Sequence, residues 1–327
     1  MSDAPVEPIE DDNVALEPID ELAALAEAVD GIDVERDVSS ADFCTYRVGG
    51  PLALLVRVSN MEALAELAEA AVALAVPTLA LGRGSNLLVA DEGFDGLAIH
   101  LVGTFGETTI DDCTVVAGGA AALPVVARAT VAAGLTGFEW AVGVPGSIGG
   151  AVRMNAGGHG SDMSESVTSV QIADLHLGGL FRRDASSLAF GYRHSAIAPW
   201  EIVASATIEL EYSEGFDSAQ MLSDIVAWRR EHQPGGANAG SVFTNPPDDS
   251  AGRLIDVTGL KGLRIGTAEV SEKHANFIQA DPGGAASDVY KLMAEVARRV
   301  EDKTGVRLQA ETHLVGFDDH PTGKADA

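Results

Sequence analysis

The first half of the chain spaces its apolar and polar residues in a way that predicts a β-α-β unit. An apolar run at residues 52–58 is typical of a strand, and Asn60 can cap the helix that follows. The apolar positions of that helix are Leu64, Leu67, Ala68 and Ala71. Residues 77–81 and 87–89 predict two short buried strands on either side of a glycine-rich turn.

The middle of the chain predicts mostly β structure. Residues 97–117 alternate closely enough for strands, and residues 123–133 predict a helix that stops at a glycine. Residues 143–160 contain too many glycines for a regular element. Strand-like runs return at residues 167–175 and 202–212, and the sequence contains no internal repeat.

The last third of the chain predicts two helices and a terminal strand. Residues 221–231 have a helical apolar pattern that stops before a proline. Ser287 is placed to cap a longer helix, which Gly305 ends. Residues 306–308 and 313–315 read as a terminal strand, and the polar stretch at 213–220 suggests a domain boundary.

The N-terminal segment is dominated by acidic residues. The first 30 residues hold ten acids and no base. Like-charge runs of this kind are usually solvated tails, so residues 1–36 are predicted to be a disordered tail, with one short helix possible at 21–29. Ordered structure is then expected to start near Asp42.

Composition excludes several functional classes. The chain has 327 residues, 46% of them hydrophobic, which suffices for two or three domains. A net charge of −28 argues against binding to nucleic acid or to an anionic membrane, and at first sight against anionic substrates. No apolar run approaches the roughly 20 residues of a membrane span, and the N-terminus does not resemble a signal peptide. With only Cys44 and Cys113, a reduced cytoplasm is the expected location.

Two glycine-rich loops are the first candidate sites. Glycine lets the backbone approach a ligand closely, and successive N–H groups in such turns form concave anion sites. Residues 82–86 and 143–150 both fit this logic, yet neither matches a Rossmann fingerprint or a P-loop. Each loop alone could be a tight turn without a ligand. Together they suggest a dinucleotide held mainly by backbone donors.

Four polar segments could carry chemistry, although each also has a purely structural interpretation. Residues 240–246 join Ser241 to an amide before two prolines, which fits either an active-site serine or an ordinary strand end. Arg193 and Glu311 could serve a site or lie on the surface, and residues 271–276 pack several polar side chains together. The histidines form no metal-binding pattern, and no hydrolase nucleophile motif occurs.

Seven motifs in order give the sequence a family resemblance between residues 42 and 316. They occupy residues 45–50, 81–96, 143–160, 190–195, 240–246, 271–277 and 305–311. In this order and spacing the chain resembles the UDP-N-acetylenolpyruvoylglucosamine reductases. Only 48 positions separate Arg193 from Ser241, so it resembles the shorter type, which lacks an inserted tyrosine loop.

The resemblance implies an α+β architecture built around FAD. The expected fold is a two-subdomain FAD-binding fold of the vanillyl-alcohol-oxidase (PCMH) type, followed by a C-terminal α+β substrate domain. We expect the FAD-binding domain at residues 37–214, split near residue 97, and the substrate domain at 215–318, before a short tail at 319–327.

The resemblance also assigns residues. It implies catalytic roles for Arg193, Ser241 and Glu311. The implied cofactor-binding residues are Gly82, Arg83, Gly84, Ser85, Asn86, Leu87, Gly143, Pro145, Gly146, Ser147, Gly150, Ala151 and Asn155. The implied substrate-binding residues are Tyr192, His232, Asn245, Lys273, His274 and Asn276, and no metal is implied.

The implied activity is the NADPH-dependent, FAD-mediated reduction of UDP-N-acetylglucosamine enolpyruvate to UDP-N-acetylmuramate, a step of peptidoglycan synthesis that serves cell shape and division. A hydride would reach the enolpyruvyl methylene carbon through FAD, and Ser241 would supply the proton. The small-molecule substrate is the expected partner, and no obligatory protein partner is evident. Another FAD-dependent oxidoreductase of the same fold and a non-catalytic nucleotide-binding protein stay open as alternatives.

Five positions depart from the family pattern. Arg83 stands where a glycine is usual, and Gly158 and His159 stand where Ala-Tyr is common. His232 and Thr244 occupy positions where many members carry a lysine or arginine. These changes leave open which bases would hold the substrate diphosphate.

Overall fold

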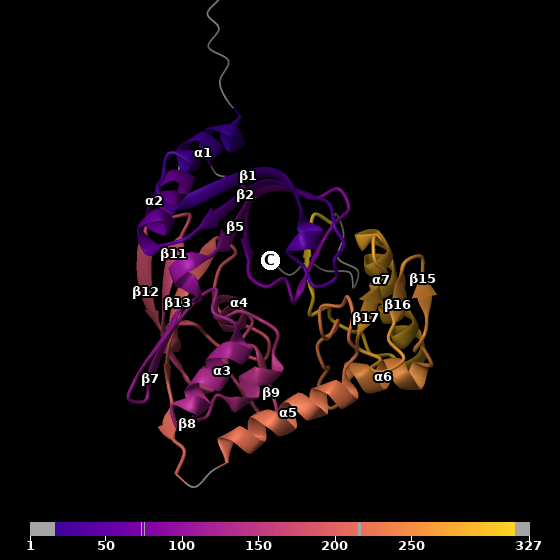
Figure 1. Cartoon of the computed structure of the whole chain (residues 1–327). Helices are drawn as coiled ribbons and strands as arrows, with labels where there is room; N and C mark the ends of the chain where they lie inside the picture. Colours follow the sequence, from indigo (N-terminus) through magenta and orange to yellow (C-terminus); the bar gives the residue numbers. More distant parts are fainter. Residues whose placement is uncertain (1–16, 73, 75, 215–216, 318–327) are drawn as a thin grey trace, which may run out of the picture.

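The computed structural model describes residues 17–72, 74, 76–214 and 217–317. Figure 1 shows two sheet-containing subdomains and a smaller C-terminal α+β domain. The long helix α5 (Ser218–His232) runs from the second subdomain to the C-terminal domain. No described helix is long and apolar enough to span a membrane.

The first subdomain is a four-stranded sheet in the order β1-β2-β5-β3. Its strands are β1 (Ile32–Ser39), β2 (Pro51–Val58), β3 (Thr78–Leu81) and β5 (Phe94–Leu101). β1 is antiparallel to β2, whereas β2 and β3 both run parallel to β5. Helices α1 (Pro18–Glu27) and α2 (Met61–Val72) pack their apolar faces against this sheet.

The β-α-β prediction for this region is confirmed. Asn60 caps α2, because its Oδ1 accepts a hydrogen bond from the Ala63 backbone N–H at 2.9 Å. Leu64 and Leu67, on the predicted apolar face, are completely buried. The sheet also places the turn between β3 and β4 (Leu87–Val89) at its end, where the first glycine-rich loop lies.

The prediction of a disordered tail up to residue 36 is wrong for residues 17–36. α1 includes most of the possible helix at 21–29, and its Leu22 is fully buried in the core of the first subdomain. β1 pairs with β2 well before Asp42, the predicted start of ordered structure. The acidic side chains hid an amphipathic pattern, since apolar residues at helical spacing bury one face while the charges stay in water. Residues 1–16 and 319–327 lie outside the described residues.

The second subdomain is a five-stranded antiparallel sheet in the order β12-β11-β13-β7-β6. Its strands are β6 (Thr108–Asp111), β7 (Thr114–Gly118), β11 (Val167–Asp174), β12 (Leu180–Asp184) and β13 (Glu201–Glu209). Helix α3 (Leu123–Ala132) covers it. The predicted split near residue 97 falls inside β5, so the division between subdomains lies after Leu101.

Smaller elements fill the connections of both subdomains. They are η1 (Ser40–Asp42), η2 (Gly103–Gly106), β8 (Leu135–Thr136), η3 (Glu139–Gly143), β9 (Gly157–Gly158), β10 (Ser161–Asp162), η4 (Met163–Glu165), η5 (Ala185–Ser187) and β14 (Glu211–Tyr212). β14 pairs with β8, and β10 pairs with β9.

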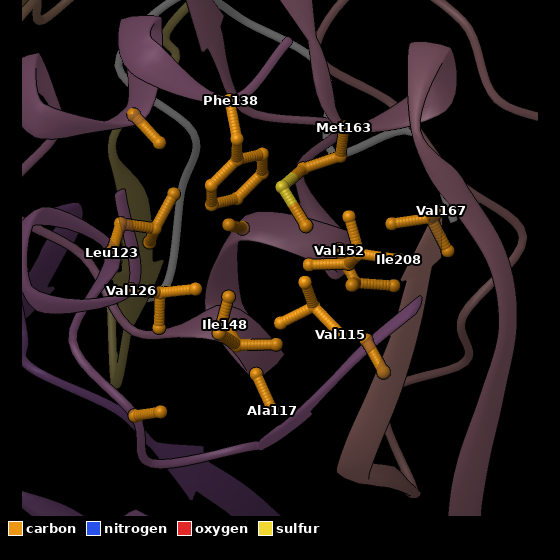
Figure 2. Close-up of a cluster of buried hydrophobic side chains, with 14 of the residues drawn as sticks. Val115, Ala117, Leu123, Val126, Phe138, Ile148, Val152, Met163, Val167 and Ile208 are labelled. Atoms are coloured by element: carbon orange, nitrogen blue, oxygen red, sulfur yellow. The ribbon is translucent and has the colours of Figure 1, made fainter. Parts of the chain in front are cut away.

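The second glycine-rich segment contains a helix, which contradicts the prediction that it holds no regular element. α4 (Ile148–Arg153) begins directly after Ser147. Figure 2 shows Ile148 and Val152 pointing into the same core as Phe138 and Met163. Burial of these two side chains therefore stabilises a short helix that its glycines alone would disfavour.

The C-terminal domain packs helices against a small antiparallel sheet. Its elements after α5 are α6 (Ala251–Thr258), β15 (Arg264–Ile265), β16 (Ala268–Val270), β17 (Ile278–Ala280), α7 (Ala286–Thr304) and β18 (His313–Val315). β18 leaves this domain and pairs in parallel with β4 of the first subdomain. Residues 306–308, predicted as strand, are described but form none. The chain end thus returns to the first glycine-rich loop.

Helix α7 is capped by a residue from another domain. The predicted cap, Ser287, lies inside the helix, and the N-terminal amides of Ala286 and Ser287 donate to the Asp91 carboxylate at 2.7 and 2.9 Å. A carboxylate at a helix N-terminus is favourable. Gly305 ends the helix in a left-handed conformation, as predicted.

Candidate functional site

A cavity of about 200 Å³ lies between the two subdomains and brings both glycine-rich loops together. The first loop contributes Gly82 and Arg83, and the second contributes Ser147 and Gly150. Apolar side chains of β3, β5 and β13 form much of the remaining wall. A narrow, largely apolar cleft with glycine-rich ends suits the planar base of a nucleotide with phosphates at the loops.

The first loop has free backbone donors. The N–H groups of residues 82–86 donate to no acceptor in the described part of the chain. Gly84 has a φ of +59°, and a Cβ at this position would lie 1.9 Å from the Phe43 carbonyl oxygen. This close contact fixes the loop in position, while its backbone N–H groups remain available to a ligand. Consecutive free N–H groups fit the pyrophosphate of a dinucleotide such as FAD.

The two loops approach each other closely at glycine positions. A Cβ on Gly82 would lie 2.7 Å from the Ser147 Oγ. A Cβ on Gly146 would lie 3.8 Å from the Ser85 Oγ. Any larger residue at Gly82 would displace the Ser147 hydroxyl from the cavity that it lines. The geometry fits a ligand that lies between the two loops and contacts both of them.

Some predicted cofactor residues do not present their side chains to this cavity. Leu87 and Ala151 are buried in the hydrophobic cores of the first and second subdomains, so any contact with a cofactor would come from their backbones. Gly143 sits beside Ile225 and Arg229 of α5 instead, and Pro145 is exposed. The remaining predicted positions belong to the two loops described above.

An ion pair between distant parts of the chain marks the second half of the site. The Arg193 Nε donates to the Glu311 Oε1 at 2.8 Å, and the two side chains are 24% and 15% exposed. Arg193 Nη2 also donates to the Gly157 carbonyl at 3.1 Å. Arg193 has a φ of +55°, an unfavourable conformation for an arginine that typically persists at functional sites.

Ser241 lies beside this ion pair. The Glu311 backbone N–H donates to the Val242 carbonyl at 2.8 Å, so the segments carrying Ser241 and Glu311 run side by side. Gly240, the preceding residue, faces the first loop, because a Cβ on it would lie 4.0 Å from the Ser85 carbonyl oxygen. The half-buried Ser241 hydroxyl has no hydrogen-bond partner among the described residues. The segments that carry the three predicted catalytic residues therefore lie next to one another.

Burial raises the pKa of the Glu311 carboxyl, and the neighbouring Arg193 guanidinium only partly offsets this. Desolvation disfavours the charged form, whereas the arginine favours it. The proton of Glu311 is thus held at a higher pH than in water. A carboxyl poised in this way can donate a hydrogen bond to a developing negative charge.

Tyr192 and Asn245 line the outer side of the site. The Tyr192 ring is 59% exposed and lies 5.3 Å from the Arg193 guanidinium carbon. Its hydroxyl accepts a hydrogen bond from the Asn245 backbone N–H at 3.4 Å. The Asn245 Oδ1 accepts from the Ala251 N–H, which leaves its amide nitrogen available. An open aromatic face next to a free amide donor suits a polar ligand.

Three further predicted substrate residues gather at the end of α5. His232 stacks on Trp228 with ring centroids 4.7 Å apart. Lys273 Nζ donates to the Arg230 carbonyl at 2.6 Å. Burial lowers the pKa of His274, and the nearby Lys261 and His232 lower it further. These groups form a local concentration of basic residues on a strongly acidic protein.

Asn276 and Asn155, predicted to bind substrate and cofactor, have buried side chains that are hydrogen-bonded to the chain itself. Asn276 Nδ2 donates to the Phe243 carbonyl at 2.8 Å, and its Oδ1 accepts from the Phe243 N–H at 3.1 Å. Asn155 Nδ2 donates to the Gly191 carbonyl at 2.9 Å. Asn276 thus holds the segment that carries Ser241, and Asn155 holds the turn that carries Arg193.

Sequence reasoning missed several residues near the site. Arg229 reaches the second loop, where a Cβ on Gly143 would lie 3.4 Å from its Cδ. Burial and the nearby Arg153 lower the pKa of His313, which follows Glu311 by two residues. His313 lies two residues beyond the last motif, and this position was the only available signal. Within the described ranges, no group of three or more acidic, histidine or cysteine side chains could hold a metal ion.

Two family models match the chain. Residues 52–182 match the family described as FAD binding domain. Residues 232–315 match the family described as UDP-N-acetylenolpyruvoylglucosamine reductase, C-terminal domain. The two matches cover the subdomains with the glycine-rich loops and the domain with Ser241 and Glu311.

Individual relatives match over most of their length. The chain is 42% identical to the UDP-N-acetylenolpyruvoylglucosamine reductase of Heliobacterium modesticaldum, over 83% of this chain and 87% of the relative. It is 37% identical to the enzyme of the same name from Clostridioides difficile, over 88% and 94%. The crystal structure of the Thermus caldophilus reductase aligns with a TM-score of 0.75 at 36% identity, covering 87% of this chain and 99% of that one.

Proposed function

The chain belongs to the UDP-N-acetylenolpyruvoylglucosamine reductase family of FAD-dependent oxidoreductases, and from this premise we propose that it reduces UDP-N-acetylenolpyruvoylglucosamine with NADPH to UDP-N-acetylmuramate. The reaction belongs to the synthesis of peptidoglycan precursors. The observation that carries the proposal is the meeting of Arg193, Glu311 and Ser241 beside two loops that fit a dinucleotide.

FAD fits the loops because the five consecutive amides of residues 82–86 have no acceptor in the described part of the chain, and Gly82, Arg83 and Ser147 line the adjoining cavity. When bound, FAD would supply the hydride chemistry that links NADPH to the enolpyruvyl methylene carbon. Residues 82–86 would hold its phosphates, and the cavity between the subdomains would take its adenine. These contacts leave the side chains of the catalytic residues free for the substrate.

Ser241 supplies the proton. Addition of a hydride to the methylene carbon leaves a negative charge on the neighbouring carbon and its carboxylate. The Ser241 hydroxyl, which has no partner in the described part of the chain, gives its proton to that carbon. A hydroxyl is a weak acid, but an enolate-like carbon is a strong base, so the transfer is feasible.

Arg193 and Glu311 stabilise the charge that develops. The Arg193 guanidinium offers a planar fork that matches the substrate carboxylate. Glu311, whose pKa is raised by burial, enters as a neutral acid and donates a hydrogen bond to the enolate oxygen. The strained Arg193 turn is held by Asn155 and Gly157, so its guanidinium is already in place before the substrate binds.

The nucleotide part of the substrate lies over the outer residues. Tyr192 and Asn245 contact the sugar, while His232, Lys273 and His274 surround the diphosphate.

The test is an assay of purified protein reconstituted with FAD. NADPH oxidation is followed with UDP-N-acetylenolpyruvoylglucosamine, and with UDP-N-acetylglucosamine as the matched control that lacks the enolpyruvyl group. We expect oxidation to depend on the enolpyruvyl ether, with one UDP-N-acetylmuramate formed per NADPH. Protein that stays colourless after incubation with FAD, or equal rates with both sugars, contradicts the proposal.

A further inference from the structure

A second cavity of about 440 Å³ adjoins the cofactor cleft. The two cavities share Gly82, Arg83 and His100 in their walls. The turn that contains Phe43 and Arg47 forms another side of the second cavity, and Gly236 of the C-terminal domain closes part of it. It therefore borders the first loop, whereas Arg193, Ser241 and Glu311 are not among its lining residues.

Two arginines give this second cavity a positive character. Neither Arg47 nor Arg83 has an ion pair or side-chain hydrogen bond within the described ranges, and both are exposed. Elsewhere arginines such as Arg57 pair with carboxylates, as expected in a chain of net charge −28. Among the described residues that line the cavity, Asp42 is the one carboxylate. Unpaired guanidinium groups in a cavity point to an anionic ligand.

The turn that carries Arg47 is strained and fixed to the first loop. Arg47 has a φ of +57°, a conformation that an arginine rarely adopts. The Thr45 N–H and Oγ1 both donate to the Gly84 carbonyl, at 3.1 and 3.2 Å. Gly84 in turn packs directly against the backbone of residues 43 and 44. Strain that the surroundings maintain at such a position is a feature of ligand-binding turns.

We propose that Arg47 and Arg83 form a binding site for a phosphate group of a nucleotide held at the cofactor cleft. The inference rests on the proposed function only in naming the nucleotides, FAD and NADPH. Both carry phosphate esters that a guanidinium fork binds well. The pair adds charged donors to the neutral amides of residues 82–86 and extends the cofactor site toward the C-terminal domain.

Charge-removing variants test the site. Arg47→Gln and Arg83→Gln are compared with Arg182→Gln, an exposed arginine of β12 in the second subdomain. FAD affinity is measured by titrating apoprotein, and flavin reduction is timed under anaerobic conditions with NADPH and with NADH. If the phosphate belongs to FAD, the dissociation constant rises about tenfold; if it is the 2′-phosphate of NADPH, the preference for NADPH over NADH falls about tenfold.

Arg47→Gly separates binding from folding. Glycine adopts a positive φ without strain, so this variant keeps the turn while it removes the guanidinium. We expect its melting temperature to stay at or above that of the parent, and its nucleotide binding to weaken as in Arg47→Gln.

The proposal is overturned if FAD affinity and the preference for NADPH over NADH both stay within twofold of the parent in the Arg47 and Arg83 variants. It is also overturned if Arg182→Gln causes the same losses. Neither measurement uses the enolpyruvyl sugar. The FAD affinity and the preference for NADPH over NADH can therefore be interpreted even if the protein does not reduce that sugar.

Discussion

The two glycine-rich loops have similar compositions but different structures. Residues 82–86 leave every backbone N–H free in the described part of the chain, and the loop is fixed by close contact of Gly84 with residues 43 and 44. The second segment contains α4, whose Ile148 and Val152 are buried in the core. Glycine content thus predicts close approach of a ligand, but it does not tell whether a loop offers its amides or uses them in a helix.

Each loop also holds one member of the ion pair between Arg193 and Glu311. Asn86 of the first loop donates to the Glu311 carbonyl at 2.9 Å. In the second segment, Asn155 and the Gly157 carbonyl hold the turn and the guanidinium of Arg193. Hydrogen bonds therefore connect each loop to one side of the ion pair.

The largest effect is expected from a methyl group at Gly84. Gly84→Ala places a Cβ 1.9 Å from the Phe43 carbonyl oxygen at a positive φ, so the loop has to move. We expect a loss of about 3 kcal/mol or more in the free energy of unfolding, together with loss of bound FAD. Chemical denaturation and flavin absorbance measure the two effects.

Gly158→Ala in the second segment is the matched control. A Cβ at Gly158 has no neighbour within 4 Å in the described structure, and its φ is not positive. We expect a change in the free energy of unfolding of less than about 0.5 kcal/mol. Equal losses in both variants would contradict the contrast between the loops.

Asparagines in the two loops give the next largest difference. Asn155→Ala removes two hydrogen bonds in a buried place and puts alanine at a φ of +40°, so we expect a loss of about 2–3 kcal/mol in unfolding free energy. Asn86→Ala removes a single, partly buried bond, and about 1 kcal/mol is expected. If urea denaturation gives a larger loss of unfolding free energy for Asn86→Ala than for Asn155→Ala, the asparagine of the first loop contributes more to stability than that of the second.

The ion pair predicts a pH dependence. Burial raises the pKa of Glu311, so the neutral donor persists above the usual pH range of a carboxyl and is lost as the pH rises through the raised value. We expect the rate of flavin reoxidation by substrate to fall about tenfold per pH unit above that value. Glu311→Gln, which stays neutral, should remove this alkaline limb. A limb that survives in Glu311→Gln would assign the titration to another group.

The smallest effect is expected outside both loops. Asp91→Ala leaves the first two amides of α7 without their partner, and such a cap contributes about 1 kcal/mol. Thermal unfolding measures the loss, and Asp91→Asn should recover part of it. We expect FAD affinity to stay unchanged, because Asp91 joins the domains without touching either loop.

The sequence alone predicted the elements whose signals are local. Asn60 and the apolar spacing of α2 specified that helix, and two of the residues that the motifs singled out, Arg193 and Glu311, form an ion pair. Contacts between residues that lie far apart in the sequence were not predicted. Asp91 caps a helix about 195 positions away, so Ser287 seemed the better candidate. α4 depends on burial of Ile148 and Val152, and its local composition gives no sign of that.

The sequence also did not indicate which polar residues of the motifs stabilise the fold. Asn276 and Asn155 belong to motifs full of ligand-binding residues, yet both are buried and bonded to backbone groups. Only the partners of a side chain tell a positioning residue from a contact residue. The prediction that the acidic segment before residue 36 is disordered was wrong for the opposite reason, because its charges concealed the apolar face of α1.

The central claim is that Ser241 supplies the proton for substrate reduction at a site that the two loops assemble. The most direct test is stopped-flow measurement of both half-reactions in Ser241→Ala. We predict flavin reduction by NADPH at the parent rate, and flavin reoxidation by UDP-N-acetylenolpyruvoylglucosamine slowed by about 10²–10⁴-fold. Equal slowing of both half-reactions, or reoxidation at the parent rate, would contradict the account.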